Sequence, residues 1–184
     1  MKQELSMLET ERLQHRPFLL EDLDRLVAIR ANEQAAQYIG GLVGNTKAQL
    51  QKRIEHYKTT HDQYGFGVEA IVWKATQEII GWSGLQPIED SEQIQLTYGV
   101  APAFWRQGIG YETAIAWLDY GFNHLQLEQI WAITAPNNTG SWKIMEKLGM
   151  YPLGLQPYKD ILCRVYAISK AGFSNNGASG LKYL

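Results

Sequence analysis

Residues 98–112 constrain the fold of this chain more than any other stretch of the sequence. A strand-like run ends at Val100, a short loop carries Gly108 and Gly110, and a helical pattern begins directly afterwards. The first turn of a helix leaves backbone N–H groups unpaired at the positive end of its dipole, and glycines let an anion approach them. Arg106 adds a fixed positive charge beside the loop. The segment therefore predicts an α/β fold with an anion site at a strand-to-helix turn.

Other readings of these glycines, and other common sites, are weighed against that one. Many α/β proteins contain a glycine-rich turn that binds nothing. A dinucleotide-binding fingerprint is not met, because Thr113 stands where its third glycine should be. The GxxxxGK[ST], HExxH and GxSxG motifs do not occur, and His56 and His61 are wrongly spaced for one helical face. We expect no metal site.

A second polar turn, residues 135–141, joins another strand pattern to another short helix. Asn138 and Ser141 lie three residues apart at the start of that helix, where an Asn side chain caps by accepting a backbone N–H. Gly149 closes the same helix at its other end. Capping alone would explain both polar residues.

The remaining periodicity sets the fold class. We expect strands at 12–16, 67–73, 79–85, 93–100, 129–135, 151–155 and 161–169, and helices at 20–31, 110–125, 141–148 and one that starts after Thr46. Thr46 with Gln49 forms a capping-box pattern. The core face of that helix is expected at Leu50, Ile54, Tyr57, His61 and Tyr64, and that of the long helix at Tyr111, Ile115, Leu118, Phe122 and Leu125. The order β-α-α-β-β-β-α-β-α-β-β predicts an α/β domain with a mixed, mostly antiparallel sheet and flanking helices.

Composition limits the domain count and the partners. The 184 residues suit one domain, expected over 1–173 with a flexible polar tail over 174–184. Seventeen basic and nineteen acidic side chains give a net charge of -2, which disfavours nucleic acid as the main partner. The start of the chain has no apolar run for a signal peptide, and no window suits a membrane span. The single cysteine, Cys163, favours a reducing cytoplasm.

Five motifs, in this order, resemble those of one known family. They are Thr10-Glu11-Arg12-Leu13 with Arg16-Pro17, then Ile80–Leu85, then Tyr98 followed by Trp105–Glu112, then Asn138-Thr139-Gly140-Ser141, and finally Glu146–Met150. Over about residues 8 to 170 the chain resembles the GNAT superfamily of acyl-CoA-dependent N-acetyltransferases, in its Rim-type branch.

The resemblance implies where a co-substrate, acetyl-CoA, would bind. Two neighbouring parallel strands, ending near Val100 and Ala135, would splay apart. Pantetheine would lie beside the strand that ends near Val100, like an added strand, and would hydrogen-bond to the backbone of Gly99 and Val100. Asn138 would also contact the cofactor. The pyrophosphate would lie on the loop amides, which belong to Arg106, Gln107, Gly108, Ile109, Gly110 and Tyr111.

The chain also departs from the family pattern. Trp105 opens the glycine loop where most of the superfamily has Arg or Gln, and we expect it to pack rather than bind phosphate. Met145 stands where many members have a proton-donating tyrosine, so the thiolate would take its proton from Ser141, from Asn138 through water, or from solvent. Gln95 replaces a glutamate common in Rim-type enzymes. The remaining candidates for the catalytic base are Glu69, Glu112 and Tyr98.

The function that follows is acetyl transfer from acetyl-CoA to a primary amine by direct attack in a ternary complex, with the N–H near Val100 as oxyanion donor. The acceptor would be a protein N-terminus or a small-molecule amine, and the enzyme a monomer or homodimer. The acceptor would bind among the first two helices, residues 38–46 and the hairpin near 158–161. The aromatic residues of these segments are Tyr38, Tyr57, Tyr64, Phe66 and Tyr158.

Two other functions stay open. A non-catalytic acyl-CoA-binding module with a decayed active site would explain Gln95 and Met145, whereas Asn138 and Ser141 favour an enzyme. A nucleotide-binding α/β domain is the third reading.

Overall fold

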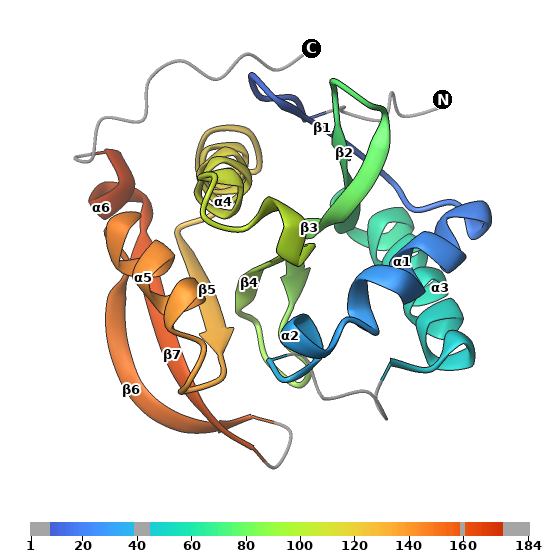
Figure 1. Cartoon of the computed structure of the whole chain (residues 1–184). Helices are drawn as coiled ribbons and strands as arrows, with labels where there is room; N and C mark the ends of the chain where they lie inside the picture. The colour runs from blue at the N-terminus through green and yellow to red at the C-terminus, as the bar shows by residue number, and fades with distance from the viewer. Residues whose placement is uncertain (1–7, 39–44, 159–160, 175–184) are drawn as a thin grey trace.

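One seven-stranded sheet organises the protein (Figure 1). The computed structural model describes residues 8–38, 45–158 and 161–174. The strands are β1 (Leu13–Arg16), β2 (Val68–Trp73), β3 (Glu78–Pro87), β4 (Ile94–Val100), β5 (Gln129–Thr134), β6 (Tyr151–Tyr158) and β7 (Ile161–Ser169). Their order in the sheet is β1-β2-β3-β4-β5-β7-β6, and every neighbouring pair is antiparallel except β4 and β5. The predicted mixed, mostly antiparallel α/β sheet is confirmed.

Helices cover both faces of this sheet. They are α1 (Leu23–Arg30), α2 (Glu33–Ala36), α3 (Lys47–Tyr64), α4 (Ile109–Asp119), α5 (Thr139–Lys147) and α6 (Lys170–Ser174). Ala70 and Ile71 are neighbours on β2, so their side chains point to opposite faces. Ala70 belongs to the core with α1 and α3, and Ile71 packs with Ile109 of α4. The helices α1 and α3 therefore cover one face, and α4 covers the other.

The parallel pair β4 and β5 stays together over only two residues. Gln95 is level with Trp131 and Leu96 with Ala132, whereas β4 continues to Val100 and β5 to Thr134. Beyond Leu96, β4 keeps its register with β3 but has no paired residue on β5. The predicted splay is present, and it opens at the ends of the two strands.

A chain of buried polar groups ties the first strands to α4. His15 Nδ1 lies 2.9 Å from the Leu8 carbonyl oxygen, which can only accept, so Nδ1 carries the proton. Burial lowers the pKa of His15 to about 4, so the neutral ring accepts at Nε2 from the Thr113 hydroxyl, 2.8 Å away. Thr113 in turn lies 2.7 Å from the Ser83 hydroxyl, to which the Trp117 indole donates at 3.0 Å. Thr113, which breaks the dinucleotide pattern, thus holds α4 to the sheet.

Several local predictions are confirmed and two need correction. The Thr46–Gln49 capping box starts α3, but Tyr64 at its last turn is 46% exposed rather than in the core. The long helix is α-helical only to Asp119 and then makes one π-type turn, in which Leu125 N–H donates to Tyr120 O. Of the expected stripe, Leu118 and Phe122 are buried, whereas Tyr111, Ile115 and Leu125 are only partly so. Trp117, which was not expected on this face, is buried as well.

Further differences lie at the ends of elements. Strand β6 runs three residues past the expected 155, because it is an edge strand and its prolines need no partner on the outer side. Helices α2 and α6 were not predicted. Residues 39–44 and 175–184 lie outside the described residues, so the domain boundary at 173 stays a prediction, although Phe173 itself is buried.

Candidate active site

The loop between β4 and α4 presents a row of free backbone donors. In the described part of the chain, none of the six N–H groups of residues 106–111 donates a hydrogen bond, and Glu112 is the first that does, to Gly108 O at 2.9 Å. Arg106 and Gly108 have positive φ values of 60° and 80°. Alternating left- and right-handed residues turn successive N–H groups toward one point, which makes a concavity for an anion. The loop therefore carries six unpaired backbone donors before and within the first turn of α4.

The two glycines of this loop have different reasons for being glycine. Gly108 is the N-cap of α4 in the left-handed region, and a Cβ there would meet only the Arg12 guanidinium at 3.5 Å. Gly110 lies inside the first turn, where a Cβ would come within 2.9 Å of Ile144 Cδ1 on α5. Gly108 is therefore required by backbone conformation, and Gly110 by the close approach of α4 and α5.

Glu112, a candidate base, instead anchors the start of the chain. It accepts from Arg12 Nε at 2.7 Å and Arg12 N at 3.0 Å, and it also accepts from the Thr10 hydroxyl. Arg12 Nη1 donates further to Gln107 O at 3.0 Å. A carboxylate that accepts from three donors and an ion pair has no room for an amine proton, so the base prediction for Glu112 is wrong. The Thr10–Leu13 motif, together with Glu112, holds the loop in place.

The free edge of β4 presents Tyr98 and Val100 to the splay. Ala101 N–H donates to Ile80 O at 2.7 Å, and backbone groups alternate sides along a strand, so those of Gly99 also face β3. Those of Tyr98 and Val100 face the other way, and the Trp105 indole N–H confirms this by donating to Val100 O at 2.6 Å. The expected backbone contact at Gly99 therefore moves to Tyr98. Trp105, expected to pack, is 39% exposed and acts through this hydrogen bond.

Gly99 is needed for packing instead. A Cβ at this position would lie 2.1 Å from Cζ2 of Trp82, its cross-strand neighbour on β3. The Trp82 ring is thus stacked against the Cα of β4 where the splay begins.

Tyr98, Ser141 and Asn138 come together across the splay. The Tyr98 hydroxyl donates to Ser141 O at 3.1 Å and lies 3.2 Å from Ser141 Oγ, while Asn138 Oδ1 accepts from Ser141 N at 3.3 Å. Burial raises the pKa of Tyr98 above its ordinary value, so at neutral pH Tyr98 can donate a proton or hydrogen bond but cannot serve as a base. The cap predicted for Asn138 is confirmed.

Glu69 lies apart from this group. It sits on β2, two strands from β4 in the sheet, with Oε1 3.7 Å from His61 Nε2 and Oε2 buried without a hydrogen-bond partner among the described residues. Burial raises the pKa of Glu69 to about 8. The structure therefore does not bring Glu69, one of the candidates for the catalytic base, to Tyr98 and Ser141.

The positions that depart from the family pattern have structural roles. Met145 is 2% exposed and belongs to the core. Gln95 donates through Nε2 to the Tyr158 hydroxyl at 3.3 Å, which joins β4 to β6. Of the expected acceptor aromatics, Tyr57 and Phe66 are core residues, so these rings do not line one groove.

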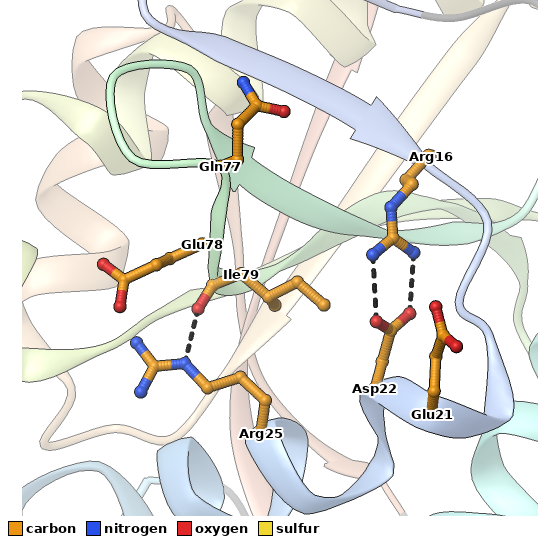
Figure 2. Close-up of a pocket in the computed structure, with 7 residues that line it drawn as sticks. All are labelled: Arg16, Glu21, Asp22, Arg25, Gln77, Glu78 and Ile79. Carbon is orange, nitrogen blue, oxygen red and sulfur yellow. Dashed lines mark hydrogen bonds and ion pairs between the residues drawn. The ribbon is translucent and has the colours of Figure 1, made fainter.

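The pocket in Figure 2 is a different feature. It lies between the start of α1 and the β2–β3 turn, and Arg16, Asp22, Arg25 and Ile79 are among the residues that line it. Arg16 forms two hydrogen bonds with Asp22, of 2.6 and 2.9 Å, and Arg25 Nε donates to Ile79 O at 2.8 Å. Arg16 and Asp22 already pair with each other, and the pocket shares no residue with the loop or the splay, so it is not the candidate site.

Fold and site together define a class. A mixed sheet whose one parallel pair splays beside an amide-lined loop at a helix start is the architecture of a GNAT-type acetyltransferase. The chain belongs to the GNAT acetyltransferase family, since the model of the acetyltransferase (GNAT) domain matches residues 12–151. Within the described residues, no helix has the length and apolar character to cross a bilayer.

The chain is also similar to several known proteins. YkkB of Bacillus subtilis (strain 168) is 31% identical over 149 residues, which cover 78% of this chain and 84% of YkkB. The uncharacterized N-acetyltransferase p20 of Bacillus licheniformis is 28% identical over 152 residues, which cover 82% of this chain and 85% of p20. Among solved structures, Mycobacterium smegmatis RimJ in complex with CoA-disulfide matches with a TM-score of 0.70 at 18% identity, covering 90% of this chain and 89% of that one.

Proposed function

We propose that this protein transfers the acetyl group of acetyl-CoA to a primary amine, by direct attack in a ternary complex. One observation carries the proposal: six successive free N–H groups lie in the connection from β4, which parts from β5 after Leu96, to α4. The loop offers a site for a pyrophosphate, and the splay offers a slot for an extended chain. The CoA-disulfide held by RimJ and the name of p20 support the same co-substrate class and N-acetylation.

The residues of this chain divide the binding between them. The amides of residues 106–111, with the exposed Arg106 side chain, would hold the phosphates. Pantetheine would lie along β4, where Tyr98 offers both backbone groups. Trp105 occupies the Val100 carbonyl, which leaves the Val100 N–H for the thioester carbonyl. Asn138 would border the same slot from the start of α5.

The chemistry needs little beyond this frame. The amine nitrogen attacks the thioester carbonyl carbon, and the Val100 N–H stabilises the oxyanion that forms. The C–S bond then breaks, an amide forms, and the sulfur takes a proton as the amine loses one. Tyr98 and Ser141, hydrogen-bonded to each other, supply the donor at the sulfur. With Glu112 anchored and Glu69 remote, the amine proton leaves through water, and holding both substrates in place contributes up to about 7–11 kcal/mol.

A pair of glycine variants tests the loop. Gly108 and Gly65 both have left-handed φ values, 80° and 77°. A Cβ would meet nothing within 4 Å at Gly65 and only the Arg12 guanidinium, at an ordinary contact distance of 3.5 Å, at Gly108. Gly108→Ala and Gly65→Ala should therefore carry a similar conformational strain. Only Gly108→Ala should lose acetyl-CoA affinity, by about tenfold or more, because its Cβ stands at the phosphate approach.

Calorimetry measures the affinity of each variant for acetyl-CoA. Assays of thiol release over a panel of amines measure turnover. Equal affinities for the two variants would show that the phosphates bind elsewhere. Tight acetyl-CoA binding without release of thiol for any amine would favour the non-catalytic acyl-CoA-binding module.

A further inference from the structure

Arg30 is a buried cation without an acidic partner. The residue is 4% exposed at the last position of α1, and none of the ion pairs formed by the described residues includes it. The sequence has no acidic residue between Glu33 and Glu55, so the segment that follows α1 brings no counter-ion. Burial lowers the pKa of Arg30 to about 10, which leaves the side chain charged at neutral pH.

The guanidinium of Arg30 is held in one orientation. Its Nε donates to Asn45 Oδ1 at 2.7 Å, and its Cζ lies 4.4 Å from the centroid of the Trp82 ring. Such a stacked guanidinium loses little further freedom when it binds a planar anion.

The two terminal nitrogens of Arg30 remain available. They make no hydrogen bond with the described residues. Among those residues, the only fully buried side-chain nitrogen or oxygen atoms without a hydrogen-bond partner are Glu69 Oε2 and Trp142 Nε1, so neither Arg30 nitrogen is fully buried. Both nitrogens of the Arg30 fork therefore reach the surface. A guanidinium fork with two free N–H edges is the geometry that pairs with a carboxylate or a phosphate.

Trp82 places this fork beside the candidate site. Its ring is stacked against Gly99 of β4, between the two residues whose backbone faces the splay. Arg30 belongs to the helix layer opposite α4, so it lies on the other face of the sheet from the loop amides. A phosphate bound at the start of α4 would leave Arg30 to the second substrate.

We propose that Arg30 binds an anionic group on the acceptor, so that the acceptor is a small primary amine that also carries a carboxylate or a phosphate. The inference rests on the proposed acetyl transfer and adds the substrate class. Polycationic amines, which would bring further positive charge to a buried guanidinium, are then poor acceptors.

Matched acceptor pairs test this inference on the wild-type protein. Amino acids are compared with their carboxamides, and phosphorylated amino alcohols with the free amino alcohols, by thiol release from acetyl-CoA. The carboxamides have the more readily deprotonated amines, so reactivity alone would favour them. We expect kcat/KM to favour the anionic member of at least one pair by about tenfold or more, as for hydrogen bonds to a charged group. An equal or reversed preference in both pairs overturns the inference.

Three variants on α1 locate the preference. Arg30→Met keeps an apolar stem on Trp82 and should bring the ratio between anionic and neutral acceptors close to one. Arg25→Met is the control, because Arg25 is on the same helix and also donates through Nε to an oxygen, but belongs to the pocket of Figure 2. Arg30→Lys, which keeps the charge without the fork, should retain only part of the preference. A ratio in Arg30→Met that equals that of the wild type overturns the role of Arg30.

A binding measurement separates this inference from the proposed reaction. Calorimetry titrates an amino acid and its carboxamide into wild-type protein saturated with CoA. Binding of the acid alone, without any turnover, would support the anion site while contradicting acetyl transfer. Turnover with equal affinity for acid and carboxamide would support the reaction and overturn the anion site.

Discussion

Ser141 contacts its neighbours through its backbone and its hydroxyl separately. Its N–H is capped by Asn138 and its carbonyl accepts from Tyr98, whereas its hydroxyl lies 3.2 Å from the Tyr98 hydroxyl and is the group that would act on a ligand in the splay. Replacing the side chain therefore leaves both structural hydrogen bonds in place. This separation makes Ser141 a clean test of the chemistry.

Ser141→Ala should lower kcat by about ten- to a hundredfold, the worth of one hydrogen bond to a charged group. The KM for acetyl-CoA should change little, because that bond strengthens only as charge develops on the sulfur. The melting temperature should also stay close to that of the wild type. Thr139→Ala, an exposed change in the same first turn, is the control and should keep wild-type kcat. An unchanged kcat in Ser141→Ala would show that solvent protonates the sulfur.

At the scale of elements, the spacing of α4 and α5 depends on Gly110. A Cβ at this position would lie 2.9 Å from Ile144 Cδ1, so a larger side chain must turn the end of Ile144 aside or push α5, and Ser141 with it, away from β4. Gly110→Val should destabilise the fold by about 1–3 kcal/mol, as overpacked sites do, and should lower kcat.

The double variant Gly110→Val with Ile144→Ala tests the cause. Removing the side chain that is struck should restore part of both stability and activity, measured by denaturant unfolding and thiol release. If the single variant is as stable as the wild type, or the double variant recovers nothing, the close approach of the two helices is not what position 110 protects.

Elements and their local signals were predictable, whereas contacts across the sheet were not. The caps at Thr46 and Asn138 and the glycine loop follow from neighbouring residues. The side of β4 that faces the splay depends on the register of β4 with β3. The sequence does not reveal that register, so the backbone contact was expected at Gly99 and not at Tyr98. Glu112 meets Arg12 from 100 residues away, and nothing near Glu112 in the sequence indicates that partner. Arg30 was missed because a lone arginine at a helix end carries no pattern.

For the whole molecule, two buried titratable groups act on stability in opposite directions. His15 has a folded-state pKa of about 4, below its ordinary 6.5, so the unfolded chain binds more protons and stability falls as pH drops from 6.5 to 4. Glu69 has a folded-state pKa of about 8, above its ordinary 4.5, so the folded chain binds more protons and stability falls as pH rises from 4.5 to 8. Stability should therefore peak in weakly acidic solution.

Glu69→Gln isolates the alkaline side of this profile. The amide cannot ionise, so the loss of stability between pH 6 and 8, on the order of 2 kcal/mol or more for the wild type, should nearly vanish. Urea unfolding of both proteins at several pH values measures it, and Glu55→Gln, an exposed change on α3, should keep the wild-type slope. A Glu69→Gln slope equal to the wild-type slope would place the titration on another group.

The anchoring of the loop by Thr10 and Arg12 has a consequence for the order in which the protein is made. These residues leave the ribosome early, and their partners Gln107 and Glu112 follow about a hundred residues later. Contacts so distant in the sequence close late in folding, because the chain entropy of a long loop must be overcome first. The loop of residues 106–111, the proposed phosphate site, therefore reaches its final geometry only when β1 has joined the sheet. Capture of a phosphorylated ligand would then mark a finished domain and not a nascent one.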